Sequence, residues 1–174
     1  MKRIAFIDGS NLFWAIREVS RQKNDLEYRL DYTQLKTLLF HNTDEVARVY
    51  YYGALPDDAS DAQLKYIQKL RYLGFKIRLF PLKKYPDNTN AREKGVDVSI
   101  AMDMLELAYN NAYDTAVLVS HDEDFCELVE RVQRIGKSVD VCGFVDRMSQ
   151  RLIEAADRVI NLVPVWDVLK WKGS

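Results

Sequence analysis

Residues 115–128, TAVLVSHDEDFCEL, place a continuous apolar run directly before three acidic side chains. A run such as TAVLV is typical of a strand that is buried on both faces, as in a parallel sheet. Asp122, Glu123 and Asp124 follow where that strand should end. Two like charges about 4 Å apart repel by roughly 4 kcal/mol at an effective dielectric of about 20. The stretch therefore predicts a buried strand, and its acids either start a helix or hold a cation.

Strand-like and helix-like segments alternate along the whole chain. Strands are expected at about 3–8, 46–53, 75–82, 115–119, 138–144 and 158–163. Helices are expected at about 11–21, 31–40, 60–73, 96–110, 122–135 and 148–156. Such alternation implies right-handed βαβ crossovers and a mostly parallel sheet with helices on both faces. The predicted fold class is α/β, a three-layer α/β/α sandwich of the Rossmann-like kind.

Length and composition indicate a soluble globular protein with one domain. The chain has 174 residues, of which 48% are hydrophobic and 29% charged, and a chain of this size buries roughly 70% of its unfolded surface. We expect a domain over residues 1–163 and a short amphipathic segment, 164–174, that docks on the domain or on a partner chain in a homodimer. No apolar run reaches the ~18 residues that a membrane span needs. The N-terminus also lacks the pattern of a signal peptide.

Charge and the rare side chains narrow the chemistry further. The net charge of −1 argues against strong nonspecific attraction to a polyanion, although one bound divalent ion would make it +1 and two would make it +3. With only His41 and His121, a His-rich zinc site is all but excluded. Cys126 and Cys142 lie among apolar neighbours without metal-ligand spacing, so we expect reduced core thiols in a cytoplasmic protein.

The first candidate site residue is Asp8, in IDGSN at the end of the first predicted strand. Gly9 permits a tight reversal there, which would hold Asp8 and Asn11 at the edge of the sheet. The alternative is purely local, because Ser10 or Asn11 could cap the next helix.

The second candidate is Asp97, near the start of the helix expected at 96–110. At 100° per residue it lines up with Met104 and Ala108 in the apolar stripe, so we expect it to point inward. A buried carboxylate needs a cation or several donors as partners. The alternative role is a favourable interaction with the helix dipole. Asp103 falls about 120° away, at the edge of the stripe, and is expected to support the site or the structure.

The third group is Asp122 and Asp124. If their helix begins near Asp122, both lie in its first turn and face the end of the preceding strand. The alternative is a capping box formed by Ser120 and Glu123, with the two aspartates favouring the helix dipole.

Taken together, Asp8, Asp97, Asp122 and Asp124 come from separate segments that meet at one edge of the predicted sheet. In such sheets ligands bind outside the carboxyl ends of strands where the strand order reverses. If the first strand lies beside 115–119, the four carboxylates converge and raise one another's pKa unless a cation lies among them. Oxygen ligands select hard cations, here Mg²⁺ or Mn²⁺. Supporting hydrogen bonds or charge are expected from Asn11, Ser120 and Lys94.

Three motifs resemble a known family. FIDGSN (6–11), KGVDVSIAMD (94–103) and VLVSHDEDF (117–125) are similar to the motifs of NYN domains, which are PIN-like nucleases, and most of all to the LabA-like branch. The resemblance covers about residues 3–162. It implies a PIN-like fold and a Mg²⁺- or Mn²⁺-dependent endoribonuclease that hydrolyses RNA phosphodiester bonds with a metal-activated water. The catalytic, metal-binding acids that it implies are Asp8, Asp97, Asp122 and Asp124. Asn11 and Ser120 match supporting positions, and Asp103 matches a position that is frequently acidic.

His121 departs from the family pattern, because many relatives have a small residue, often Gly, at its position. The imidazole could narrow the opening of the site, add a proton-transfer group, or point away from it. The consecutive Ser120, His121 and Asp122 are not a catalytic triad, because that geometry brings together residues from separate segments.

RNA contacts are expected from two basic regions. The polar segment 83–94 combines basic groups that can follow phosphates with an aromatic ring that can stack on a base; its candidates are Lys83, Lys84, Tyr85 and Arg92. Arg17 and Arg21 form a second patch on the first helix. Both regions could instead be ordinary solvated surface.

Two other classes of function were weighed against the nuclease. One is a catalytically silent NYN domain that binds RNA or a protein in a regulatory role, which His121 and the modest net charge would suit. The other is a phosphatase or receiver-like switch on a similar sheet. Ser10 stands where such a phosphatase expects a second Asp, and IDGSN lacks the adjacent acids of a receiver.

Overall fold

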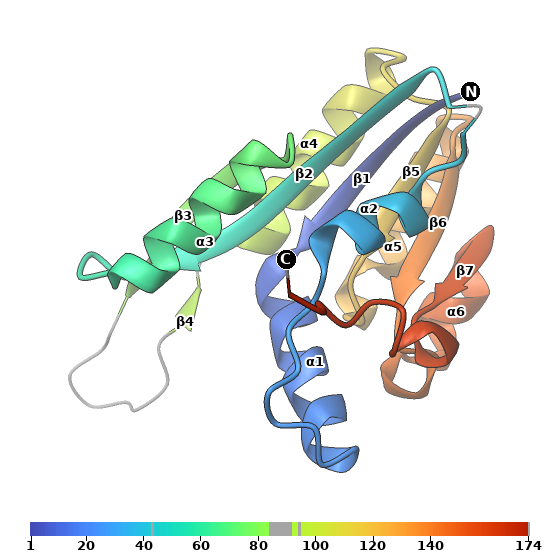
Figure 1. Cartoon of the computed structure of the whole chain (residues 1–174). Helices are drawn as coiled ribbons and strands as arrows, with labels where there is room; N and C mark the ends of the chain where they lie inside the picture. Colours follow the sequence, from blue (N-terminus) through green and yellow to red (C-terminus); the bar gives the residue numbers. More distant parts are fainter. Residues whose placement is uncertain (43, 84–91, 94, 174) are drawn as a thin grey trace.

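The computed structural model describes residues 1–42, 44–83, 92–93 and 95–173, and its elements are labelled in Figure 1. The strands are β1 (Lys2–Asp8), β2 (Val46–Leu55), β3 (Lys76–Lys83), β4 (Arg92–Glu93), β5 (Thr115–Val119), β6 (Ser138–Gly143) and β7 (Arg158–Asn161). The α-helices are α1 (Gly9–Gln22), α2 (Tyr32–Leu39), α3 (Asp61–Tyr72), α4 (Val96–Tyr109), α5 (Cys126–Arg134) and α6 (Gln150–Ala155). Short 3-10 turns are formed by Glu123–Phe125, Val145–Arg147 and Val163–Val165.

The central sheet is parallel. Within the described part of the chain, six parallel strands lie in the order β3-β2-β1-β5-β6-β7, and the short β4 pairs antiparallel with β3 at one edge. From β1 the chain builds outward through β2 and β3, and it then returns to the other side of β1 for β5, β6 and β7. The strand order therefore reverses between β1 and β5, as predicted.

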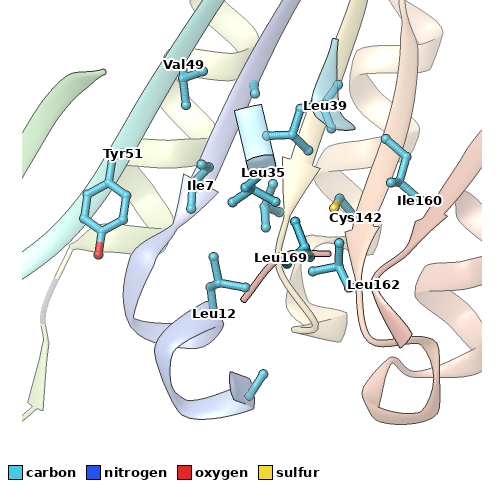
Figure 2. Packing of buried hydrophobic residues seen from close by; sticks show 14 of the residues in the cluster. Ile7, Leu12, Leu35, Leu39, Val49, Tyr51, Cys142, Ile160, Leu162 and Leu169 are labelled. Carbon is cyan, nitrogen blue, oxygen red and sulfur yellow. The ribbon is translucent and has the colours of Figure 1, made fainter. Parts of the chain in front are cut away.

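Helices cover both faces of this sheet, which confirms the three-layer sandwich (Figure 1). On one face, α1, α2 and α3 pack over the strands, and Figure 2 shows Leu12 and Leu35 beside Ile7 of β1. On the other face, α4, α5 and α6 form a second core that includes Ile100 and Val129.

Residues of β1 show why continuous apolar runs make the central strands. Side chains alternate between the two faces of a strand. Ala5 and Ile7 accordingly pack into the core beneath α1, whereas Ile4 and Phe6 pack into the core beneath α4. Both faces of β1 are therefore buried.

The C-terminal segment packs on its own domain, which was one of the two predicted alternatives. The Trp166 ring stacks on Tyr28 with ring centroids 3.6 Å apart. Leu30 and Lys170 form an antiparallel bridge, and Leu169 is buried. Among the described residues, no helix combines the length and apolar character needed to cross a membrane.

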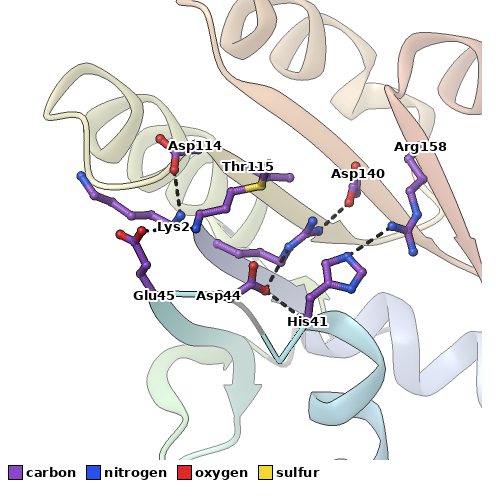
Figure 3. Close-up of polar contacts among 10 residues, drawn as sticks. Lys2, His41, Asp44, Glu45, Asp114, Thr115, Asp140 and Arg158 are labelled. Atoms are coloured by element: carbon purple, nitrogen blue, oxygen red, sulfur yellow. Dashed lines mark hydrogen bonds and ion pairs between the residues drawn. The ribbon is translucent and has the colours of Figure 1, made fainter.

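A network of charged groups lies at the end of the sheet where the parallel strands begin, as Figure 3 shows. Arg3 lies between two acids, with Nη1 2.6 Å from Asp140 and Nε 3.3 Å from Asp44. All three side chains are at most 6% exposed. This ion-pair cluster lies where the parallel strands begin. Ligands are expected at the opposite end of the sheet, beyond the carboxyl ends of the strands.

One predicted helix begins later than expected. The helix placed at 122–135 starts at Cys126, because Glu123–Phe125 form a 3-10 turn first. Cys126 and Cys142 are both buried and are not joined in a disulfide, as predicted for core thiols.

Candidate functional site

The turn from β1 into α1 fixes the first acid. Asp8 is 5% exposed and is itself the N-cap of α1, since its Oδ1 accepts a hydrogen bond from the backbone N–H of Asn11 (3.2 Å). The sequence had suggested Ser10 or Asn11 as the cap. Glycine is required at position 9, because a Cβ there would lie 2.4 Å from Cζ of Tyr51. The close packing of this turn holds Asp8 at the carboxyl end of β1.

Helix α4 brings the second acid to the same place. Asp8 and Asp97 line one cleft with a volume of about 300 Å³. Among the residues that the structure describes, the cleft is lined by Asp8, Ser10, Asn11, Gly95, Val96, Asp97 and Val98. Gly95 precedes the helix with a left-handed φ of 93°, and as the N-cap residue of α4 it has no side chain with which to cap the first turn.

The expectation that Asp97 points into the core is wrong. The buried stripe of α4 consists of Val96, Ile100, Met104 and Ala108, and the side chain of Asp97 is exposed at the cleft. Asp97 lies in the first turn of α4, which is level with the end of the sheet. A side chain next to the buried stripe therefore faces the cleft there instead of packing on the strands.

Asp122 and Asp124, which follow β5 in the sequence, lie close enough to Asp97 for their charges to act on it. Partial burial raises the pKa of Asp97, and the carboxylates of Asp122 and Asp124 raise it further. Asp122 caps the 3-10 turn by accepting from the backbone N–H of Asp124 (2.9 Å). The buried Ser120 Oγ accepts from the N–H of Asp122 (3.3 Å), so the predicted capping box with Glu123 does not form.

The four acids thus gather at one end of the sheet, but loosely. Asp8 and Asp97 share the cleft, and Asp122 and Asp124 act on Asp97 through their charge. Over the residues that the structure describes, no three His, Cys, Asp or Glu side chains lie close enough together to form a ready-made metal site. A set of oxygen donors around one cleft suits a hard cation, which would have to draw the carboxylates closer.

His121 is held away from the cleft by both of its ring nitrogens. Its Nε2 accepts from the backbone N–H of Phe144 (2.9 Å), so the proton lies on Nδ1, which donates to Oδ1 of Asn11 (2.7 Å). The imidazole ring also stacks on the ring of Phe144, with ring centroids 5.9 Å apart. Of the three predicted roles, the structure supports an orientation away from the site. His121 instead positions Asn11, whose Oδ1 also accepts from the His121 backbone N–H (2.9 Å).

Asp103 takes the structural alternative predicted for it. Its Oδ2 accepts from the Tyr52 hydroxyl (2.7 Å) and pairs with Arg78 Nε (3.1 Å). The sequence could not reveal these partners, because they come from neighbouring strands whose order has to be known first.

The substrate-binding predictions fall mostly outside the described part of the chain. Lys84, Tyr85 and Lys94 lie outside it, as do the side chains of Lys83 and Arg92.

On α1, by contrast, Arg17 and Arg21 are exposed, which both predicted alternatives, a contact surface and an ordinary solvated face, require. Sequence reasoning missed Phe13 and Trp14, two exposed aromatics on the same helix. A helical wheel places both roughly opposite the buried Leu12, Ala15 and Val19 and could have found them.

Comparisons with known proteins identify the family of this chain. The family model described as NYN domain matches residues 3–163. The low amplitude and bright protein LabA of Synechococcus elongatus is 30% identical over 167 residues, which span 90% of this chain and 81% of that protein. An uncharacterized protein of Methanocaldococcus jannaschii is 37% identical over 67 residues, covering 38% of this chain and 28% of that protein. A crystal structure of a protein of unknown function from Vibrio parahaemolyticus has a TM-score of 0.76 and 31% identity, covering 98% of this chain and 96% of its own.

Proposed function

The chain belongs to the NYN domain family of PIN-like nuclease domains, and from this premise we propose that it is an endoribonuclease that cuts RNA phosphodiester bonds with the help of Mg²⁺ or Mn²⁺. Family membership supports a nuclease-type function. The RNA substrate, the metal and the residues are our proposal.

The observation that supports the proposal most is the shared cleft of Asp8 and Asp97. These acids come from different elements, β1 and α4, and line the same cleft where the strand order reverses. A carboxylate whose pKa is raised by neighbouring carboxylates is stabilised by a cation placed among them. The raised pKa of Asp97 and its dependence on Asp122 and Asp124 fit such a place.

The donor set also fits the class of metal. The side chains proposed to hold it are Asp8, Asp97, Asp122 and Asp124, which offer only carboxylate oxygens. Mg²⁺ and Mn²⁺ prefer such ligands, whereas zinc sites favour His and Cys. When bound, such an ion lowers the pKa of a coordinated water and stabilises negative charge on a phosphate.

The backbone around the cleft suits a phosphodiester. The N-cap residue Gly95 has no side chain with which to cap the first turn of α4, and the residues Val96, Asp97 and Val98 of that turn line the cleft. Uncapped N–H groups and the positive end of the helix dipole favour a phosphate. We propose that α4 orients the scissile phosphate while Asn11, held by His121, keeps the opposite wall of the cleft in place.

The direct test is cleavage of RNA by the purified protein with Mn²⁺, comparing Asp8→Asn and Asp122→Asn with the wild type. Each substitution should reduce the cleavage rate by at least about 100-fold, because the metal-bound water and its charge stabilisation depend on these acids. Glu106→Gln is the matched control, since it removes an exposed carboxylate from α4 away from the cleft. Cleavage that survives both aspartate substitutions would reject the assignment.

A catalytically silent NYN domain that binds RNA is the second candidate. The absence of a ready-made metal cluster among the described residues favours it. It predicts RNA affinity that is unchanged by chelator, together with no cleavage of any RNA at saturating Mn²⁺.

A further inference from the structure

The outward face of α1 exposes two large aromatic rings next to each other. Phe13 is 51% exposed and Trp14 is 55% exposed. Their rings meet edge to face, with centroids 5.6 Å apart and an interplanar angle of 76°. Exposure of this much aromatic surface to water is unfavourable, and burying the two rings would gain free energy. The position of the pair relative to the cleft indicates what could cover it.

The aromatic pair is continuous with the cleft along one side of the helix. Ser10 lines the cleft, and Trp14, Arg17 and Arg21 follow it at spacings of 4, 7 and 11 residues. Residues at these spacings lie on one face of an α-helix. At 1.5 Å per residue the stripe reaches about 16 Å from the cleft. In Figure 1, α1 extends from the carboxyl end of β1 beyond the end of the sheet, and Trp14, Arg17 and Arg21 are exposed.

The charge along the stripe is positive. The guanidinium of Arg17 lies 5.7 Å from the ring centroids of both Phe13 and Trp14, within the range of a cation–π interaction. Glu18, the one acid in α1, pairs with Arg147. Within the described part of the chain, the surface beside the rings therefore combines π faces with cations that form no ion pair.

We propose that Phe13, Trp14 and Arg17 form a stacking platform for the unpaired bases of a single-stranded nucleic acid whose backbone leads into the cleft. Every base presents a π face, so aromatic rings bind single strands with little sequence preference. Arg17 and Arg21 complement the phosphate charge next to the rings. A duplex keeps its bases stacked inside and cannot use the platform. The inference rests on the proposed function, because it assigns the strand to the same cleft.

The test is the affinity for a labelled, unstructured single-stranded RNA, measured by fluorescence anisotropy in chelator so that no cleavage occurs. Trp14→Ala and Phe13→Ala should each raise Kd by at least about five-fold, the lower bound for the loss of one stacked base. Tyr72→Ala is the matched control, because it removes an aromatic ring that is 87% exposed on α3, and it should leave Kd unchanged. Binding of a blunt RNA duplex should be unchanged in all three variants.

Three outcomes would overturn the platform. The wild-type protein could fail to bind the single strand, or both α1 variants could bind it as tightly as the wild type. Alternatively, Trp14→Ala could turn a dimer into a monomer in sedimentation velocity without altering Kd, which would assign the rings to contact between two copies of the chain.

The binding test and the cleavage test can fail separately. If Trp14→Ala weakens binding but the wild type never cuts RNA, the platform stands and the nuclease proposal falls. If the wild type cuts RNA and Trp14→Ala binds normally, the nuclease proposal stands and the platform is rejected.

Discussion

At the scale of single residues, Asp97 is the most informative side chain. Its raised pKa has partial burial as the largest cause, followed by Asp122 and then Asp124. The same repulsion that raises this pKa is what a bound cation would remove.

Asp122→Asn should therefore lower the pKa of Asp97 toward its ordinary value of 3.8, because one nearby negative charge is lost. The measurement is a ¹³C carboxyl NMR titration in chelator, with Glu106→Gln as the control that leaves the pKa unchanged. An identical Asp97 titration in wild type and Asp122→Asn would mean that the two carboxylates lie farther apart than the structure has them.

His121 gives a second residue-scale prediction, a specific loss of stability in acid. Burial and then the charge of Arg147 lower its pKa to about 4, from the ordinary value of 6.5 for histidine. As pH falls from 6.5 toward 4, the unfolded chain takes up a proton that the folded chain does not bind, so folding stability decreases across that window. This lowering of the pKa of His121 corresponds to about 3 kcal/mol in the free energy of unfolding.

His121→Gln should lack this contribution, since glutamine does not titrate. In metal-free buffer, urea denaturation at pH 7 and pH 4 should show a smaller decrease in the free energy of unfolding for the variant than for the wild type. Equal decreases would show that His121 does not change its proton affinity on folding.

The sequence predicted that the acids group at one end of the sheet, and in the structure Asp8 and Asp97 line one cleft while Asp122 and Asp124 raise the pKa of Asp97. The sequence did not predict the surroundings of these acids. Asp8 and Asp122 are helix caps, and this is compatible with the proposed metal-binding role because a carboxylate has several lone pairs. The direction of Asp97 depended on where the sheet ends, and the partners of Asp103 depended on strand order. Neither is encoded in local spacing.

At the scale of elements, the turn from β1 to α1 couples packing to the site. Gly9→Ala would place a methyl group 2.4 Å from Cζ of Tyr51 and 2.6 Å from the carbonyl oxygen of Tyr52. We expect a loss of about 1–3 kcal/mol in the free energy of unfolding, typical of overpacking, measured by chemical denaturation. Because the backbone carbonyl cannot rotate away as a side chain can, the turn that holds Asp8 should shift as well. Full stability in the variant would contradict this packing.

Elements with a strong pattern were predictable, and those set by local hydrogen bonds were less so. β1 and β5 were evident because both of their faces are buried and their apolar runs are continuous. The start of α5 was misplaced because Asp122 caps a 3-10 turn before the helix begins, a choice between two turn types that the pattern of apolar residues does not distinguish.

At the scale of the whole molecule, opposite ends of the sheet serve different purposes. The site lies at the carboxyl ends of the strands, and the buried ion pairs of Arg3 with Asp44 and Asp140 lie at the amino-terminal edge (Figure 3).

Arg3→Met should cost about 3–5 kcal/mol of stability, because it leaves two buried carboxylates without their guanidinium. Arg131→Met is the matched control: it breaks an exposed pair with Glu127 and should cost less than about 1 kcal/mol. Thermal or urea denaturation measures both. Equal effects of the two substitutions would show that the buried cluster contributes no more than a surface pair.

The central claim is that a divalent cation binds among the acids at the ends of β1 and β5 and at the start of α4. An anomalous difference map from a crystal soaked in Mn²⁺ tests it most directly. We predict a peak in the cleft between Asp8 and Asp97 that is absent from the Asp97→Asn variant. A cleft without any peak at saturating Mn²⁺, or a peak that persists in Asp97→Asn, would contradict the account.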